Sequence, residues 1–197
     1  MPIAFRSALE ERLGWRNRYF VVTFKKKKLA EHWAKSKRNF NIVTKDSQKW
    51  YTPRYILDAL GQFDLDPCSP PVRPFDTARK HYTMLDDGLC KPWRGRVWLN
   101  PPYIDIQTWM LALARHGNGI ALTFNRLGTH WFEKVVMPYT TGLLFLTGNL
   151  SKEGEGSTAP HSSVLIAYDP PGSGFNKSAL KCSGLAGSFV DRGLRID

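Results

Sequence analysis

Short apolar runs recur along the chain after residue 50, separated by polar turns. Each run has the length of a buried strand and is rich in β-branched or aromatic residues. We therefore predict five strands in this part of the chain. They are Phe63–Asp66, Arg96–Leu99, Gly119–Phe124, Gly142–Leu146 and Ser163–Tyr168.

Amphipathic segments between these runs predict helices. Apolar residues recur with helical spacing from residue 106 to 113, and Gly117 can end that helix. A second helix is expected from Thr129, its N-cap, to before Pro138. A third is expected at Thr52-Pro53, with Thr52 as cap and Pro53 as the first helical residue. Strands that alternate with helices predict an α/β domain with a largely parallel sheet.

The two ends of the chain differ from this middle. Residues 1–45 form a distinct basic arm, in which Leu29–Phe40 could be a short helix. After Asp169, a Pro-Pro-Gly-Ser-Gly stretch begins a weakly patterned tail, which we expect to be a linker and a loosely attached end. The predicted division is an arm of residues 1–45, a folded domain of residues 46–170 and a tail of residues 171–197.

Composition excludes several classes of protein. A chain with 42% hydrophobic and 13% aromatic residues is globular and not disordered. No apolar run approaches the roughly 18 residues of a membrane span, and none resembles a signal peptide, so we expect no membrane partner. Three cysteines without C-x-x-C spacing, and five histidines without metal-ligand spacing, predict no disulfide framework and no metal. These features fit a reducing cytoplasm.

Positive charge is concentrated at the start of the chain. The net charge is +11, and residues 1–49 alone hold 13 Lys or Arg against 4 Asp or Glu. Aromatic residues are interleaved with this charge, a pattern typical of segments that bind nucleic acid. The alternative is a solvated surface that serves only solubility. The candidate nucleic-acid contacts in the arm are Lys25, Lys26, Lys27 and Lys28.

The tetrapeptide Asn100-Pro101-Pro102-Tyr103 is the strongest candidate for chemistry. It directly follows a predicted strand, and ligands of open α/β sheets bind at the carboxyl ends of strands. The Asn100 side-chain oxygen and a proline carbonyl form a rigid pair of acceptors that can hold both hydrogens of an exocyclic amino group. Tyr103 beside them offers a stacking surface for a planar base. The alternative is a Pro-Pro turn with Tyr103 as core packing.

These residues resemble the catalytic motif of amino-group methyltransferases, and the surrounding sequence is similar to the phage-type DNA N-6-adenine methyltransferase (Dam-like) family. The ordered set of matches covers roughly residues 46–169. It consists of Asp46, Trp50-Tyr51-Thr52-Pro53, Phe63-Asp64-Leu65-Asp66, Cys68-Ser69, Asp87-Gly88-Leu89, Trp93, Gly95-Arg96-Val97-Trp98, the Asn-Pro-Pro-Tyr motif, Arg126, Thr129, Trp131, Gly148, Ala159-Pro160 and Ser163. Two departures stand out. Gly128 replaces the family's acidic residue, and a proline-rich insert, Pro70–Phe75, follows Asp66 where no glycine-rich loop is present.

The resemblance implies a Rossmann-like AdoMet-dependent methyltransferase fold with helices on both faces of the sheet. It implies S-adenosyl-L-methionine (AdoMet) as cofactor, with Asp64 or Asp66 on its ammonium group. Strand alternation is expected to point both carboxylates to the same side, at the carboxyl edge of the sheet. The alternative is an Asx turn before Pro67. Either Asp86 or Asp87 would meet the ribose, unless they only form a solvated turn. Thr52-Pro53 would lie near the AdoMet carboxylate, unless it only starts a helix. The set of implied cofactor contacts is Trp50, Thr52, Pro53, Asp64, Asp66, Cys68 and Asp87.

The implied reaction is methylation of the 6-amino group of adenine in double-stranded DNA, at a specific site. The base is expected to flip out of the stack into the Asn-Pro-Pro-Tyr pocket. Arg126 and Thr129 are expected to contact phosphate or the flipped base, whereas Trp131 is expected in the core. The resemblance also suggests a phage or prophage origin, a role in restriction-modification, and the bacterial host cytoplasm. Two alternatives stay open: an amino group of cytosine, RNA or protein as acceptor, and an inactive nucleic-acid-binding protein of the same fold.

Overall fold

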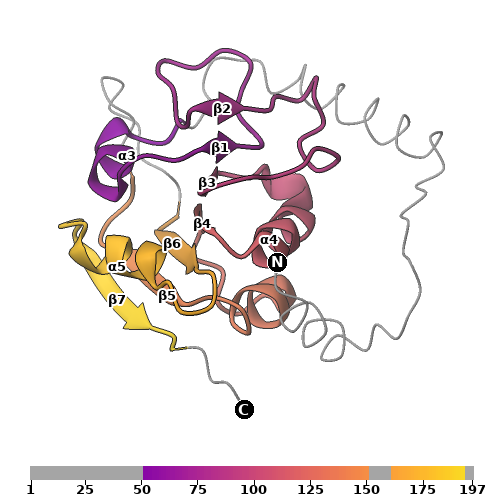
Figure 1. Cartoon of the computed structure of the whole chain (residues 1–197). Coiled ribbons are helices and arrows are strands. Elements are labelled where there is room, and N and C mark those ends of the chain that lie inside the picture. Colours follow the sequence, from indigo (N-terminus) through magenta and orange to yellow (C-terminus); the bar gives the residue numbers. More distant parts are fainter. Residues whose placement is uncertain (1–50, 151–160, 194–197) are drawn as a thin grey trace, which may run out of the picture. The chain divides into compact units, whose positions relative to one another are not determined.

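The computed structural model describes residues 51–150 and 161–193 of the chain, which belong to a unit spanning Trp50–Asp197. Its centre is a seven-stranded sheet with the order β2-β1-β3-β4-β6-β5-β7 (Figure 1). The first four strands in that order are parallel, and every later pairing is antiparallel. The strands are β1 (Leu65–Asp66), β2 (Lys80–His81), β3 (Val97–Leu99), β4 (Gly119–Phe124), β5 (Gly142–Leu146), β6 (Ser163–Tyr168) and β7 (Gly187–Asp191).

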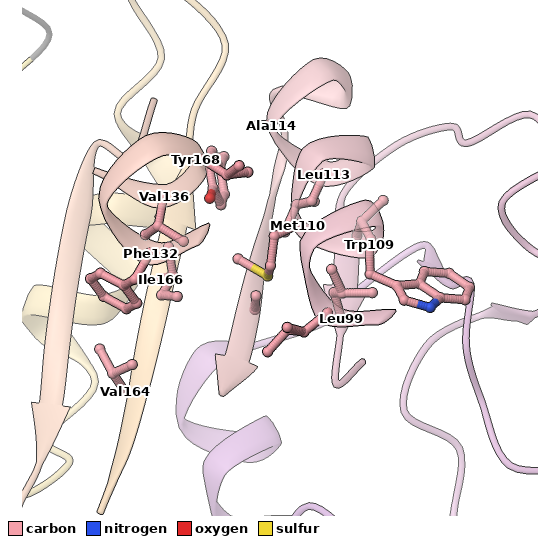
Figure 2. Packing of buried hydrophobic residues seen from close by; sticks show 14 of the residues in the cluster. Leu99, Trp109, Met110, Leu113, Ala114, Phe132, Val136, Val164, Ile166 and Tyr168 are labelled. Carbon is pink, nitrogen blue, oxygen red and sulfur yellow. The ribbon is translucent and has the colours of Figure 1, made fainter. Parts of the chain in front are cut away.

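Helices pack on both faces of the sheet, because alternate strand residues point to opposite sides. Val97 and Leu99 of β3 join one buried cluster with α4 (Ile106–His116) and the π-helical turn Phe132–Val136. Trp98, between them, joins a second cluster with α3 (Arg54–Leu60) and α5 (Phe175–Cys182). Figure 2 shows the first cluster, where Met110 and Leu113 of α4 lie opposite Phe132 and Val136. The expected mixed α/β architecture is confirmed, although only half of the sheet is parallel.

The predicted elements of the middle of the chain are largely confirmed. β4, β5 and β6 have the predicted bounds, and β1 and β3 lie inside the predicted runs. The helix after residue 105 buries the predicted apolar face and ends at Gly117, which adopts the left-handed conformation (φ 70°). The helix expected from Thr129 forms, but most of it is wound as a π-helix, with Met137 donating to the Phe132 carbonyl oxygen.

The expected start of α3 was wrong by one residue. Pro53 is the N-cap of α3, so Thr52 lies before the helix and does not cap it. The Thr52 hydroxyl instead accepts a hydrogen bond from the side chain of Asn100. A contact with a distant part of the chain thus replaces the local capping bond.

The expectation of a loosely attached C-terminal end was also wrong. Residues 175–182 form α5, and β7 pairs along its full length with β5. β7 is an edge strand without buried residues, and only Asn176 and Leu180 of α5 are buried. The apolar pattern that identifies the central strands is therefore missing from this segment.

A buried polar network closes the amino-terminal edge of the sheet. Arg96, which precedes β3 and is 7% exposed, donates to the Asn176 side chain and to the carbonyl oxygens of Leu60 and Gln62. The rings of Phe63 and Phe175 lie 4.1 and 4.9 Å from its guanidinium carbon. Burial lowers the pKa of Arg96 to about 10, despite nearby carboxylates that raise it. Arg96 therefore joins α3, β3 and α5.

No helix within the described ranges, 51–150 and 161–193, has the length and apolarity needed to cross a membrane.

Candidate active site

The candidate site lies where the strand order of the sheet reverses. From β1 the chain passes to β2 on one side, and then to β3 on the other side of β1. Ligands of open α/β sheets bind at such a switch point, outside the carboxyl ends of the strands. Asp66 ends β1 and Asn100 follows β3, so the two side chains meet at this place. Both line one cleft.

Asp66 is a buried carboxylate, only 3% exposed. One oxygen accepts the backbone N–H of Cys68 and the other accepts the hydroxyl of Thr77. Burial raises the pKa of Asp66 to about 6, an effect larger than the opposing ones of these hydrogen bonds and of Arg73. A carboxylate oxygen can accept two hydrogen bonds, so Asp66 keeps capacity for a cationic ligand.

Cys68 connects the two halves of the cleft. Its backbone N–H binds Asp66, and its thiol donates to the backbone carbonyl of Asn100 at 3.3 Å. Burial raises the pKa of the Cys68 thiol, which therefore stays protonated and keeps its donor. The Asn100 side-chain nitrogen donates to the Thr52 hydroxyl at 3.2 Å. The Asn100 side-chain oxygen is thereby available as an acceptor.

Tyr103 begins a second part of the site, beyond Asn100. Its ring stacks on Phe124, the last residue of β4, with centroids 4.4 Å apart and planes 7° apart. Its hydroxyl accepts the backbone N–H of Phe124, and His161 meets the edge of the Phe124 ring. Burial raises the pKa of Tyr103 to about 12. Tyr103 is nevertheless 45% exposed, so it is not packed in the core.

The segment after β4 carries the other predicted DNA contacts. Arg126 is exposed, and its charge lies close enough to Tyr103 to oppose the rise in the pKa of that residue. The Thr129 hydroxyl donates to the Arg126 carbonyl at 2.7 Å, which holds the turn. Trp131 is partly buried against the main core cluster, as predicted. Gly128 is exposed, and a side chain there would meet nothing within 4 Å.

The structure separates Asp64 from Asp66. Asp64 precedes β1, accepts the backbone N–H of Arg96 at 2.8 Å and lines a different pocket, with Lys80 and Arg94. The expectation that both carboxylates lie together at the carboxyl edge of the sheet was therefore wrong. The short strand β1 begins only at Leu65, so Asp64 closes the turn before β3.

Asp86 and Asp87 form a turn that does not line the Asp66 cleft. Hydrogen bonds from the Thr83 backbone and hydroxyl hold the pKa of Asp86 below its usual value. Asp87 has a left-handed backbone (φ 54°), and its carbonyl accepts the Cys90 N–H. The following Gly88 lies so close to the Pro67 carbonyl oxygen that a Cβ atom would be 1.8 Å away. This turn therefore packs against the residue that follows Asp66, and any ribose contact stays a prediction.

The other predicted site residues divide into three groups. Thr52 and Cys68 line the cleft, and Pro53 is buried beside Thr52. Trp50 and the lysines at positions 25–28 lie outside the described residues. Pro101 is buried and Pro102 exposed, directly before Tyr103.

Several residues of the site have no counterpart in the sequence prediction. Arg73, Pro74 and Phe75 of the proline-rich insert, followed by Thr77, line the Asp66 cleft. Phe124 and His161 complete the Tyr103 side. The insert itself was visible in the sequence as a departure from the family, but nothing in the sequence placed it over Asp66.

In the described part of the chain, no three His, Cys, Asp or Glu side chains gather as a metal site would require.

The fold and site define an α/β protein with an amide, a carboxylate and an aromatic pair at the carboxyl edge of its sheet. Residues 22–159, well over half of the chain, match the family model described as DNA N-6-adenine-methyltransferase (Dam). The chain therefore belongs to the DNA N-6-adenine-methyltransferase family, whose general chemistry is methylation of adenine in DNA. The match begins within the basic arm. No curated protein and no solved structure matches the chain significantly.

Proposed function

We propose that this protein transfers the methyl group of AdoMet to the 6-amino group of an adenine flipped out of double-stranded DNA. The observation that carries the proposal is the shared cleft of Asp66 and Asn100 at the switch point of the sheet. A cationic ligand group and an amino-bearing base would meet there. AdoMet would supply an electrophilic methyl group on a sulfonium centre and would leave as a neutral thioether, and the amino group would lose one proton on methylation.

Asn100 is the residue proposed to hold the reacting amino group. Its side-chain nitrogen is engaged by Thr52, which directs the side-chain oxygen toward a donor. With the carbonyl of Pro101 as second acceptor, it would bind both amino hydrogens of adenine. These hydrogen bonds strengthen as positive charge develops on the attacking nitrogen, so they stabilise the transition state more than the ground state. No covalent enzyme intermediate is required.

Tyr103 is proposed to stack on the flipped base. Phe124 already covers one face of its ring, so the base would use the other face. Flipping costs a few kcal/mol of stacking and pairing, which such a platform offsets in part. The Tyr103 hydroxyl accepts the Phe124 N–H, which holds the ring in place for stacking.

Asp66 fits the ammonium group of AdoMet in charge and position. A buried carboxylate that already accepts two hydrogen bonds is oriented before a cation arrives. Asp64 lines another pocket, which favours Asp66 for this role.

The test is to incubate the protein with AdoMet labelled in its methyl group and with unmethylated duplex DNA, and then to identify the modified nucleoside. We expect label in N6-methyladenine. Label in a cytosine derivative, or transfer only to RNA or protein, would show that adenine in DNA is not the acceptor. AdoMet binding without any transfer would indicate an inactive protein of the same fold.

The basic arm is proposed to bind the DNA backbone through Lys25–Lys28. Replacing these four lysines by glutamine should weaken binding to all DNA sequences alike. The slope of log affinity against log salt should flatten by about 0.9 for each lysine that contacts a phosphate. A salt titration of duplex binding measures this. An unchanged slope would assign DNA binding to the rest of the chain.

A further inference from the structure

The proline-rich segment, residues 70–77, covers the Asp66 cleft. Phe75 and Arg73 line the cleft from this segment, and Thr77 closes it by donating to Asp66. The Tyr51 hydroxyl donates to the Val72 carbonyl at 3.2 Å and ties the segment to the chain before α3. Asp66 is only 3% exposed, so this segment restricts the access of a ligand to its carboxylate.

The charges that line the cleft form a matched pair. Asp66 is its one acidic residue and Arg73 its one basic residue among the described residues that line it. The two are near enough for the Arg73 charge to oppose the rise in the pKa of Asp66. The remaining walls are polar or aromatic, with Tyr51, Phe75 and Trp98 among them. One carboxylate and one guanidinium are the complement of a zwitterionic α-amino acid, which carries an ammonium and a carboxylate on one carbon.

The two terminal nitrogens of Arg73 are available to donate hydrogen bonds to such a ligand. Its side chain is 27% exposed, and its Nε donates to Asp76 at 2.9 Å, which fixes the plane of the guanidinium. In the described residues no hydrogen bond is made by its two terminal nitrogens, which can form the paired N–H contacts that arginine makes with carboxylates. Asp76 is itself 71% exposed, so solvent screens its competition for the guanidinium.

We propose that Arg73 binds the carboxylate of the methionine end of AdoMet, while Asp66 binds its ammonium. The proline-rich segment would then take the place of the missing glycine-rich loop as the wall of the cofactor site. It would fold over the ligand because one of its own side chains binds it. This assignment rests on the proposed use of AdoMet.

The test compares two ligands, AdoMet and its decarboxylated form, by calorimetry on the full-length protein. Arg73→Met should weaken AdoMet binding about 10- to 100-fold, the scale of a charged hydrogen bond, and should leave the decarboxylated ligand within about twofold. Arg73→Lys, which keeps the charge but not the planar fork, should lose less affinity for AdoMet. Arg79→Met is the matched control, because Arg79 pairs with Asp64 outside the cleft and should affect neither ligand.

The outcomes separate this assignment from the proposed function. If Arg73→Met weakens both ligands equally, or neither, Arg73 does not bind the carboxylate and the assignment is overturned. If the wild-type protein binds AdoMet and methylates adenine, but Arg73→Met changes the affinity for both ligands by the same factor, only the assignment fails. If the wild-type protein binds no AdoMet at all, the proposed function fails with it.

Discussion

The amino edge of the parallel strands buries Arg96 together with Asp169, and their carboxyl edge buries Asp66. The surroundings of Arg96 and Asp66 differ. At the amino edge, Arg96 makes three hydrogen bonds to α3, the turn before β1 and α5, and two aromatic rings enclose it. At the carboxyl edge, Asp66 accepts two hydrogen bonds and faces a cleft. Arg96 is committed to joining elements of the fold, whereas Asp66 keeps hydrogen-bonding capacity for a ligand.

The pKa values of the two groups express the same difference. Burial lowers the pKa of Arg96 only to about 10, so it remains charged at neutral pH. Burial raises the pKa of Asp66 to about 6, so Asp66 is charged at neutral pH by a much smaller margin than Arg96. A binding site with an unsatisfied charge costs stability, and a ligand of opposite charge recovers it. The comparison predicts that substitutions at the carboxyl edge impair ligand binding or catalysis without destabilising the protein, whereas substitutions at the amino edge destabilise it.

Asn100→Ala is expected to have the largest effect. It removes the proposed acceptor for the amino group, so methyl transfer should fall by several orders of magnitude while AdoMet binding changes only a few-fold. Single-turnover methylation and calorimetry measure the two quantities. The midpoint of thermal unfolding should stay near that of the wild type. Near-normal methylation would show that the motif is only a turn.

Arg96→Met is expected to lower the free energy of unfolding by about 3–5 kcal/mol, because it leaves the acceptors in α3, in α5 and in the turn before β1 without their donor. Urea unfolding followed by tryptophan fluorescence measures the loss. Arg96→Lys is the companion variant, and since a single ammonium cannot span the same acceptors it should also destabilise. If instead stability is unchanged and only AdoMet affinity falls, the division between the two edges is wrong.

Asp66→Asn should weaken AdoMet binding by about 1.5–3 kcal/mol and yet stabilise the unliganded protein at neutral pH. The pKa of Asp66 is raised from 3.8 to about 6 in the folded state. Between these values the folded state binds more protons than the unfolded one, so wild-type stability falls as pH rises from about 4 to 6 and stays lower above that. The variant should lack this loss. Urea unfolding between pH 4 and 8 compares the two proteins, and parallel curves would contradict the prediction.

Tyr168→Phe is expected to have the smallest effect, a gain of at most about 1 kcal/mol. The Tyr168 hydroxyl is buried without a hydrogen-bond partner among the described residues, and Figure 2 shows it among the apolar side chains of the core. Removing it relieves an unpaired polar group without opening a cavity. Thermal unfolding measures the gain, and methylation by the variant should match the wild type. A clear loss of stability would mean that the hydroxyl has a partner.

The sequence predicted those elements that bury a continuous apolar face. The strands Gly119–Phe124, Gly142–Leu146 and Ser163–Tyr168 were predicted with their bounds, because nearly every residue in them is buried. β2 and β7 were not predicted, since they lie at the two edges of the sheet and none of their residues is buried. Backbone pairing with a neighbouring strand forms these edges, and such pairing leaves no apolar pattern in the sequence.

For the site, the sequence by itself determined the motif Asn100–Tyr103, the acidic end of β1 and membership of the family, because these depend on residue types at short, fixed spacings. Only the tertiary structure decided which carboxylate faces the cleft, and that Arg73 and Thr77 close it. It also decided that Phe124 supports Tyr103. Local sequence specifies which side chains lie at the end of a strand. The partners of that strand end come from distant segments, which packing of the sheet and its connections brings within hydrogen-bonding distance.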